Sequence, residues 1–463
     1  MANRIAVLWF RRDLRLHDHP ALTHGLDTFD AVLPLFIADD RILRGRWPSA
    51  NRRWFLSGAL GSLQDDLGAR GSGLHLVRGD PVEAVPRIAA AVGAVAVVAS
   101  RDYGPYGRRR DDAIAARLED VGISWEAGRG LLVHEPEDVR REGGGAFAVF
   151  SPFHRRWQQL PVRAVLPAPS SIPTVTPPAH LDFESDPRAL IEDTRPTADV
   201  RLLKDPTERA ARARLDAWAT SRALRDYANG RDRLDQDGTS RLSQDLRWGL
   251  LSPVEVVDRI AGEGTGPARY RSEIAWRDFY AHLLWHEPRV ARRAFREDLE
   301  EVAWSRDDAA ILAWKEGRTG YPVVDAAMRQ LTASGWMHNR ARMIVASFLT
   351  KHLGVDFRVG EQHFMEHLVD GDPASNNGGW QWAASTGTDP QPYFRVFNPT
   401  LQGRRHDPSG EYVRRWVPEL AGLAALEGAA VHEPPPGTYL ERIVEHAPAR
   451  RRAIESFEER ARR

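Results

Sequence analysis

Cysteine is absent from the 463 residues. Disulfide bonds, a thiolate nucleophile and any cysteine-ligated zinc or iron–sulfur site are therefore excluded. Only three of the 64 basic residues are lysine and none of them follows glycine, which excludes a Gly-Lys-Ser/Thr phosphate loop. An excess of one charge is also missing, because the formal net charge is zero. A nucleic-acid partner would have to meet a local basic patch.

A long apolar run is lacking at the start of the chain, where Ile5–Phe10 is followed at once by Arg11-Arg12-Asp13. This stretch is too short for a signal peptide or a membrane span, so we expect a cytoplasmic protein. Hydrophobic residues make up 42% and charged residues 28%, as in globular proteins. The length predicts two or three domains.

Short apolar runs alternate with helix-forming segments in the first part of the chain. The four strand-like runs are Ile5–Phe10, Ala31–Ile37, Leu74–Val77 and Ala94–Ala99. They predict a parallel, Rossmann-like α/β domain over residues 1–130. The Gly-x-Gly-x-x-Gly fingerprint of an ordinary dinucleotide site does not follow the first run.

Proline marks the predicted connection, with six prolines among the 18 residues from Pro161 to Pro178. This density disrupts helices and sheets, so we place a long linker over residues 131–200. Helical periodicity dominates beyond it, for example at Ala326–Leu331 and Ile344–Leu349. The fold class is therefore an N-terminal α/β domain joined to an all-helical domain over residues 201–463.

Tryptophan is abundant, with 15 in the chain. A single tryptophan is usually a core residue, but its flat face also stacks an unpaired base and its ring is readily oxidised. The run Asp370–Trp382 combines two such rings with paired Asn and Gly. Asp372-Pro373 is typical of a helix start, and the run suits the wall of a ring-binding pocket.

Two further features suit an anionic ligand. Gly238–Ser243 is a turn before an expected helix, with hydroxyl and backbone N–H groups available for a phosphate. Arg342 offers a planar donor fork for a diphosphate, with Asp370 as its counter-charge. Many helices begin with Ser or Thr without binding anything.

His363-Phe364-Met365-Glu366-His367 matches His-x-x-Glu-His, which on a helix places two imidazoles beside a carboxylate. This is the inverted zinc-peptidase pattern. The alternative is a helix face with two ordinary histidines, and we assign no metal ligand.

Six blocks of sequence resemble the photolyase/cryptochrome family, specifically the class I cyclobutane pyrimidine dimer photolyases. The likeness extends over essentially the whole chain. The blocks are Trp9–Leu16, Gly238–Ser243, Trp276–Tyr280, Gly320–Leu331, Gly335–Arg340 and Asp370–Trp382.

The resemblance implies an FAD held in the helical domain and an amide, Asn376, facing its reactive ring nitrogen. The positions that match the family's cofactor contacts are Tyr227, Thr239, Ser240, Arg241, Leu242, Ser243, Arg277, Trp336, Asn339, Arg342, Asp370, Gly371, Asp372 and Asn376.

It also implies light-driven repair of UV-damaged DNA, in which an electron from excited reduced FAD splits a cyclobutane pyrimidine dimer that has left the duplex. The expected protein is a deoxyribodipyrimidine photolyase, monomeric and unattached to a membrane, which associates with the nucleoid when bound to DNA. Positions matching lesion and DNA contacts are Arg231, Glu273, Trp276, Arg277, Asn339, Arg340, Met343, Trp382, Arg395 and Gln402.

The family reloads its flavin through three tryptophans. Trp380 and Trp304 match the inner and outer positions, but Phe357 stands at the middle one. Phenylalanine is much harder to oxidise, so either another aromatic such as Trp314 bridges the gap or photoreduction is slow.

The segment Asp102–Asp111 resembles the version found in photolyases with an 8-hydroxy-5-deazaflavin antenna. We therefore expect a second chromophore of that type, although its site could be empty. Its expected contacts are Phe36, Asp39, Arg52, Asp102, Gly107 and Arg110.

Two alternatives stay open at the sequence level. The first is a cryptochrome-like blue-light sensor without repair activity, although signalling members typically carry long C-terminal tails. The second, more remote, is a zinc peptidase through His363, Glu366 and His367.

Overall fold

The computed structural model describes residues 4–192, 194–300, 304–390, 392, 395–423 and 426–461. The chain divides into two compact units. Unit 1 comprises residues 1–196, 204–221 and 240–288, and unit 2 comprises residues 197–203, 222–239 and 289–463. These boundaries differ from the predicted domains, because part of the expected linker and several later helices belong to unit 1. Each unit is described by itself.

Unit 1 contains a five-stranded parallel sheet with the order β3-β2-β1-β4-β5. The first four strands correspond to the predicted apolar runs. The fifth was missed, because its sequence Ser-Trp-Glu-Ala-Gly has no apolar run. The strands are β1 (Ile5–Phe10), β2 (Ala31–Ala38), β3 (His75–Arg78), β4 (Ala94–Ser100) and β5 (Ser124–Gly128).

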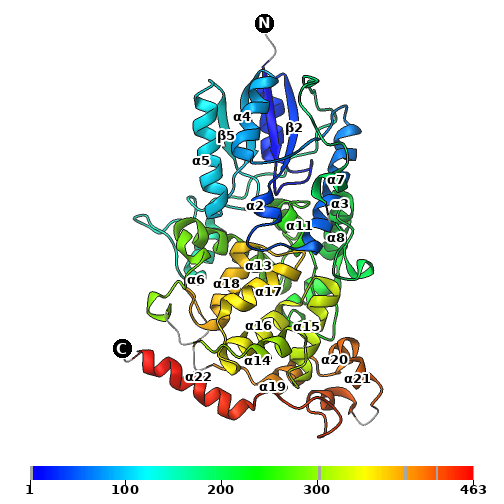
Figure 1. Ribbon diagram of the computed structural model, residues 1–463, viewed down its shortest axis with the longest axis vertical. Coiled ribbons are helices and arrows are strands. Elements are labelled where there is room, and N and C mark those ends of the chain that lie inside the picture. Colours follow the sequence, from blue (N-terminus) through cyan, green and yellow to red (C-terminus); the bar gives the residue numbers. More distant parts are fainter. Residues whose placement is uncertain are drawn as a thin grey trace. The chain divides into compact units, whose positions relative to one another are not determined.

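Helices cover the sheet, as parallel strands require. Helices α4 and α5 pack on β4 and β5, and Figure 1 shows both helices beside β5. Val7 and Trp9 of β1 belong to the same core. The helices of unit 1 are α1 (Pro20–Thr28), α2 (Asp40–Leu43), α3 (Ala50–Gly68), α4 (Pro81–Ala91), α5 (Pro105–Glu119), α6 (Phe150–Gln159), α7 (Pro187–Ile191), α8 (Glu208–Thr220), α11 (Ser243–Trp248), α12 (Pro253–Arg259) and α13 (Thr265–His286).

The proline-rich segment is extended and partly lies along the sheet. The backbone N–H of Val32 donates to the carbonyl of Pro173 at 2.9 Å, and Val32 forms an isolated bridge with Thr174. The stretch predicted as a linker is thus tied to β2 of unit 1.

Unit 2 is helical, as predicted. Its core gathers side chains of α14 to α18 and of α20 around Trp314, Phe348, Phe357 and Trp380. The elements are η1 (Val200–Leu202), α9 (Arg222–Arg225), α10 (Tyr227–Gly230), η3 (Glu297–Leu299), α14 (Asp308–Lys315), α15 (Pro322–Ser334), α16 (Asn339–Ser347), the π-helical turn η4 (Phe348–His352), α17 (Phe357–His367), α18 (Pro373–Ala384), α19 (Pro399–His406), α20 (Glu411–Trp416), α21 (Pro418–Ala421), η6 (Gly428–His432) and α22 (His446–Ala461). The short helix η2 (Pro288–Ala291) spans the boundary between the units in sequence.

Within the residues that the structure describes, every helix is too short or too polar to cross a bilayer.

Candidate functional site

Helix α18 presents the polar and aromatic run that the sequence singled out. Its N-cap is Asp372, whose carboxylate accepts a hydrogen bond from the backbone N–H of Ser375 at 3.0 Å, and Pro373 stands in the first turn. The predicted helix start is therefore confirmed. Asn376 and Trp380 are four residues apart and share one face of the helix.

An ion pair joins α16 to the segment before α18. Arg342 Nη2 donates to Asp370 Oδ2 at 2.8 Å, while its Nε donates to the Met337 carbonyl at 2.8 Å. The other carboxylate oxygen, Asp370 Oδ1, is buried and has no hydrogen-bond partner among the described residues. A buried acceptor without a donor is costly, so this oxygen fits an N–H or O–H group of a ligand. FAD carries both kinds of donor.

Glu361 of α17 fixes the two amides of α18. Asn376 Nδ2 donates to the Glu361 carbonyl at 3.0 Å, and Asn377 Nδ2 donates to Glu361 Oε1 at 3.0 Å. Gln381 Nε2 donates to Asn377 Oδ1 at 2.9 Å and to the Arg293 carbonyl at 3.1 Å. This network fixes the plane of the Asn376 amide before a ligand binds.

The three relay positions lie in the core of unit 2. Phe357 and Trp380 are buried, and Trp304 is partly buried against the same cluster. Trp314 is fully buried with its ring centroid 6.1 Å from that of Trp380, and its indole N–H donates to the Val345 carbonyl at 3.2 Å. Trp314, the alternative electron-transfer residue suggested by the sequence, thus lies beside Trp380, the expected inner tryptophan.

Two expected lesion contacts, Asn339 and Met343, meet on one face of α16. Asn339 Nδ2 lies 3.9 Å from Met343 Sδ. The next residue, Arg340, donates through Nη2 to Asp232 Oδ2 at 2.7 Å. Burial alone would raise the pKa of Asp232, but Arg340 and Arg231 lower it, so this carboxylate stays charged beside them. Trp382 is partly buried against the core of unit 2, and Trp336 lies 6.3 Å from the His338 ring.

The expected phosphate contacts lie in and before α19. Arg395 is exposed, and its backbone carbonyl accepts a hydrogen bond from Lys351 Nζ at 3.3 Å. Lys351 is buried in η4, and burial lowers its pKa to about 7. Gln402 Oε1 is buried without a hydrogen-bond partner among the described residues. Arg231 of the same unit lies 5.9 Å from the Tyr227 ring centroid.

The predicted phosphate turn, Gly238–Ser243, crosses from unit 2 to unit 1 in sequence between Thr239 and Ser240 and leads into α11. Ser240 Oγ accepts a hydrogen bond from the Tyr270 hydroxyl at 2.7 Å and from the Leu242 N–H at 3.4 Å. Arg241 adopts a φ of 52°, a left-handed conformation that costs free energy in a non-glycine residue. Gln244 Nε2 donates to the Arg241 carbonyl at 2.6 Å and supports this backbone.

Helix α13 of unit 1 carries Glu273, Trp276 and Arg277. Glu273 Oε1 lies 3.3 Å from Arg269 Nη2, one turn earlier. Arg277 donates to the Leu131 carbonyl and, at 3.4 Å, to the Leu246 carbonyl. Some donors of Arg277 are thus already used by the protein, and its two expected roles toward cofactor and phosphate stay predictions.

The expected antenna contacts gather after β2 and β4. Tyr106 donates through its hydroxyl to Asp39, and Arg110 Nη2 lies 3.5 Å from Asp102 Oδ2. Burial alone would raise the pKa of Asp102, but three arginines lower it to about 2. A Cβ at Gly107 would lie 2.4 Å from the Asp102 carboxyl carbon, so glycine is needed there. Phe36 is buried on β2, and Arg52 lies in α3.

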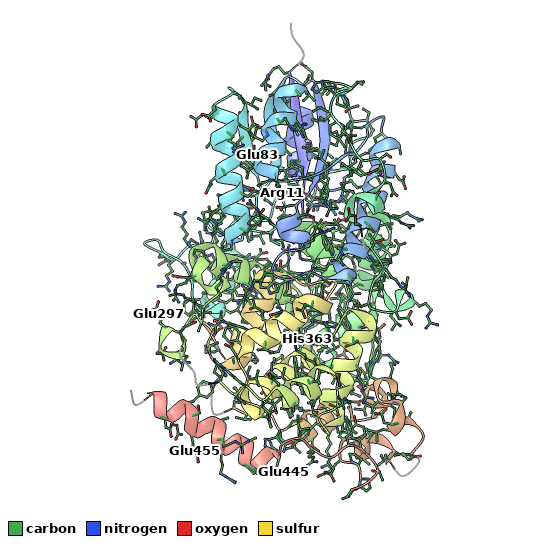
Figure 2. The ribbon with its side chains drawn as sticks, viewed as in Figure 1. Arg11, Glu83, Glu297, His363, Glu445 and Glu455 are labelled. Carbon is green, nitrogen blue, oxygen red and sulfur yellow. The ribbon has the colours of Figure 1, made fainter. Side chains whose placement is uncertain are left out.

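The three residues of the His-x-x-Glu-His motif lie on α17, as predicted, with ligand atoms within 4.8 Å of one another (Figure 2 labels His363). His363 is only 6% exposed, and its ring lies 5.5 Å from that of Trp314. Burial, with the charges of His367 and Lys315, lowers the pKa of His363 to about 3. Because His363 is buried against Trp314, its role is explained by packing, and we do not propose a peptidase.

Two residues that hold expected site residues in place were not predicted from the sequence. Glu361 holds Asn376 and Asn377, and Tyr270 holds Ser240. Glu361 is 15 residues from Asn376, and Tyr270 is 30 from Ser240. Nothing in the local pattern of either residue signals such a distant partner.

A parallel α/β unit, and a helical unit with the Arg342–Asp370 pair and the Asn376 amide, are consistent with a flavoprotein of the photolyase type, and comparison with known proteins agrees. Residues 6–172 match the family model described as DNA photolyase, and residues 270–459 match the FAD binding domain of DNA photolyase. The chain belongs to the DNA photolyase family. It is therefore an enzyme of DNA repair, a photolyase whose cofactor is FAD.

Several relatives are similar over most of their length. Deoxyribodipyrimidine photo-lyase of Streptomyces griseus is 42% identical, covering 93% of this chain and 92% of that protein. The Synechococcus enzyme of the same name is 39% identical, covering 89% and 88%. A class III photolyase structure from Agrobacterium tumefaciens is 35% identical, with a TM-score of 0.92 over 100% of this chain and 99% of that one. A Synechocystis cryptochrome is 27% identical, with a TM-score of 0.88 over 98% and 99%. The class I label stays a prediction.

Proposed function

We propose that this photolyase repairs cyclobutane pyrimidine dimers in DNA. The observation that carries the proposal is the arrangement on α16 and α18 of unit 2. There Arg342 lies on the same helix, α16, as Asn339 and Met343, and it pairs with the buried Asp370, which keeps one acceptor oxygen without a partner among the described residues. A cofactor contact and two lesion contacts are thus presented by one element.

Each unit carries residues expected to contact FAD. In unit 2 Arg342 offers donors to the diphosphate, Asp370 offers an acceptor, and the Asn376 amide faces the reactive ring with its plane fixed by Glu361. In unit 1 the Ser240–Ser243 backbone adds donors at the start of α11. When bound and reduced, FAD supplies the photoexcited electron that splits the cyclobutane ring.

The remaining residues of the chain bind and orient the lesion. A dimer that stacks poorly is cheaper to extrude from the duplex. Trp276 of unit 1 and Trp382 of unit 2 are the expected stacking residues, and each offers a flat ring to a base. Glu273 accepts a hydrogen bond from a pyrimidine edge. Arginines hold the flanking phosphates, with Arg340 fixed in place by Asp232.

The test uses pre-reduced protein, blue light and an oligonucleotide with one thymine dimer. We expect loss of the dimer and recovery of two thymines, with no reaction in the dark. Unchanged dimer after illumination of FAD-loaded, reduced protein would contradict the proposal.

The similarity to a Synechocystis cryptochrome supports a second candidate function. This function is that of a blue-light sensor without repair activity. A sensor would load FAD and respond to light yet leave the dimer intact. The same assay therefore separates the two functions.

We further propose a second chromophore of the 8-hydroxy-5-deazaflavin type beside Asp39, Asp102 and Arg110. The paired charges after β2 and β4 support a polar ligand at this edge of the sheet. An absorption spectrum of the purified protein, compared before and after denaturation, would identify any chromophore besides FAD.

A further inference from the structure

Trp276 lies against a second aromatic ring in unit 1. Its ring centroid is 3.7 Å from that of Phe150, with an interplanar angle of 8°. Phe150 in turn stacks on His154, with a centroid distance of 5.2 Å and an angle of 11°. We call these three parallel rings the stacked triplet.

The stacked triplet is held from several sides. Phe150 is buried at the start of α6, and Phe279 meets it edge-on at 5.7 Å and 74°. Phe279 also meets Trp276 edge-on, at 5.5 Å and 82°. Because an overlapping face-to-face pair is not the arrangement that ring quadrupoles favour, packing of α6 on α13 must impose it.

His154 closes the triplet without adding charge. Its Nε2 is buried and has no hydrogen-bond partner among the described residues. Burial, together with the charge of Arg269, lowers the pKa of His154, so its ring is neutral at pH 7. A neutral imidazole gives Phe150 a flat support on the side away from Trp276.

We propose that Phe150 is the positioning residue for Trp276, setting the plane of the indole on which the extruded pyrimidines stack. This inference rests on the proposed function, because it takes Trp276 as a lesion contact. Phe150 covers one face of the indole, so a base would stack on the part of the indole that Phe150 does not cover. An indole already fixed in plane loses less rotational freedom when the lesion binds.

The experiment replaces Phe150 in the full-length, FAD-loaded protein. Phe150→Leu removes the flat ring but keeps an apolar side chain. Because Phe150→Leu removes the support of the indole but keeps the indole itself, we expect only part of the stacking contribution to be lost, and the Kd for dimer-containing single strands to rise about 5- to 20-fold. Affinity for undamaged strands, FAD content and repair yield per bound dimer should stay as in the wild type. Phe150→Tyr keeps a flat ring and should restore the affinity.

Phe147→Leu is the matched control. Phe147 lies in the same segment and packs on Phe153 and His282, with centroid distances of 6.2 and 6.5 Å. We expect dimer affinity to stay at the wild-type value. If Phe150→Leu does not fold, Phe150→Met replaces it with the same expectation, since Met adapts to irregular space.

A double-mutant cycle with Trp276→Ala separates positioning from packing. If Phe150 acts through Trp276, adding Phe150→Leu to Trp276→Ala should cause almost no further loss of dimer affinity. Additive losses, or wild-type affinity in folded Phe150→Leu, would overturn the inference while leaving dimer repair by the wild type intact. Failure of the wild type to repair dimers would overturn the proposed function and this inference together.

Discussion

Phe357 shows how one residue departs from the pattern of its family. It lies buried in the core of unit 2, at the position expected for the middle tryptophan of the family's relay, and Trp314 lies beside Trp380. Repair itself does not use this relay, whereas reloading of oxidised FAD does. A substitution at Phe357 should therefore change the photoreduction of FAD but not the repair of dimers.

Phe357→Trp is expected to speed photoreduction of oxidised FAD several-fold, because tryptophan is far easier to oxidise than phenylalanine. The initial rate under blue light with a thiol donor measures this. Dimer repair by pre-reduced protein should be unchanged. Equal photoreduction rates in the two proteins would mean that electrons already bypass Phe357, and Trp314→Phe would then slow them.

At this scale the sequence predicts what depends on near neighbours. The cap by Asp372 and the pair of Arg342 and Asp370 follow from local pattern or from charge complementarity, and both are present. The stack of Phe150 on Trp276 was not predictable, because it joins residues 126 positions apart through the packing of two helices.

Helices α17 and α18 carry Glu361 and Asn376, the residue expected to face the flavin. They meet where Gly360 faces Trp380, and a Cβ on Gly360 would lie 2.1 Å from Cη2 of the indole. This contact sets how closely the two helices approach. The sequence predicted both helices but gave no sign of this contact.

Gly360→Ala is expected to destabilise the fold by about 1–3 kcal/mol, because the added methyl group overpacks a filled core. Thermal unfolding followed by circular dichroism measures it. Gly61→Ala in α3 is the control, since no atom lies within 4 Å of its Cβ position. Replacing a helical glycine of that kind with alanine should raise the free energy of unfolding by about 0.5–1 kcal/mol. Equal stability of Gly360→Ala and the wild type would mean that Trp380 moves freely.

The π-helical turn η4 buries Lys351, whose pKa burial lowers to about 7. Between pH 7 and 10 the unfolded chain holds a proton on this amine that the folded chain lacks, so stability should rise with pH there. Below pH 7 the folded amine must be charged, and the whole burial penalty is present.

Lys351→Met should therefore raise the free energy of unfolding by about 2–4 kcal/mol at pH 7 and remove that rise. Urea unfolding at pH 7 and pH 9.5 measures both effects. Lys315→Met in α14 serves as the control for loss of a lysine. A variant less stable than the wild type at both pH values would mean that the bond to the Arg395 carbonyl outweighs burial.

At the scale of the whole molecule, zero net charge limits how DNA is bound. The arginines expected to meet phosphates are Arg231, Arg340 and Arg395 of unit 2 and Arg277 of unit 1. With four such contacts, the logarithm of the binding constant for single strands should fall with the logarithm of salt concentration with a slope of about −3.

Arg395→Ala is expected to make that slope less steep by the share of about one phosphate contact. It should also weaken binding equally for all sequences. Filter binding from 50 to 300 mM NaCl measures it. Arg201→Ala, an 88% exposed arginine paired with Asp199, is the control and should leave the slope unchanged. An unaltered slope in Arg395→Ala would remove this residue from the DNA contacts.

The sequence also predicted the order of α/β and helical parts, because strand and helix periodicities differ. It did not predict which segments form each compact unit, since Ser240–Pro288 joins the sheet's unit through tertiary packing alone. Strand β5 was not predicted for a related reason, because it forms through pairing with β4 and its own residues show no strand pattern.

The interleaving of the two units has a consequence for synthesis on the ribosome. Unit 1 needs α13, which ends at His286, and the chain inserts residues 222–239 of unit 2 before it. A nascent chain of 200 residues would therefore expose apolar surface that only later segments cover, and it would be a ready target for chaperones. Folding of this protein should finish late in translation rather than domain by domain.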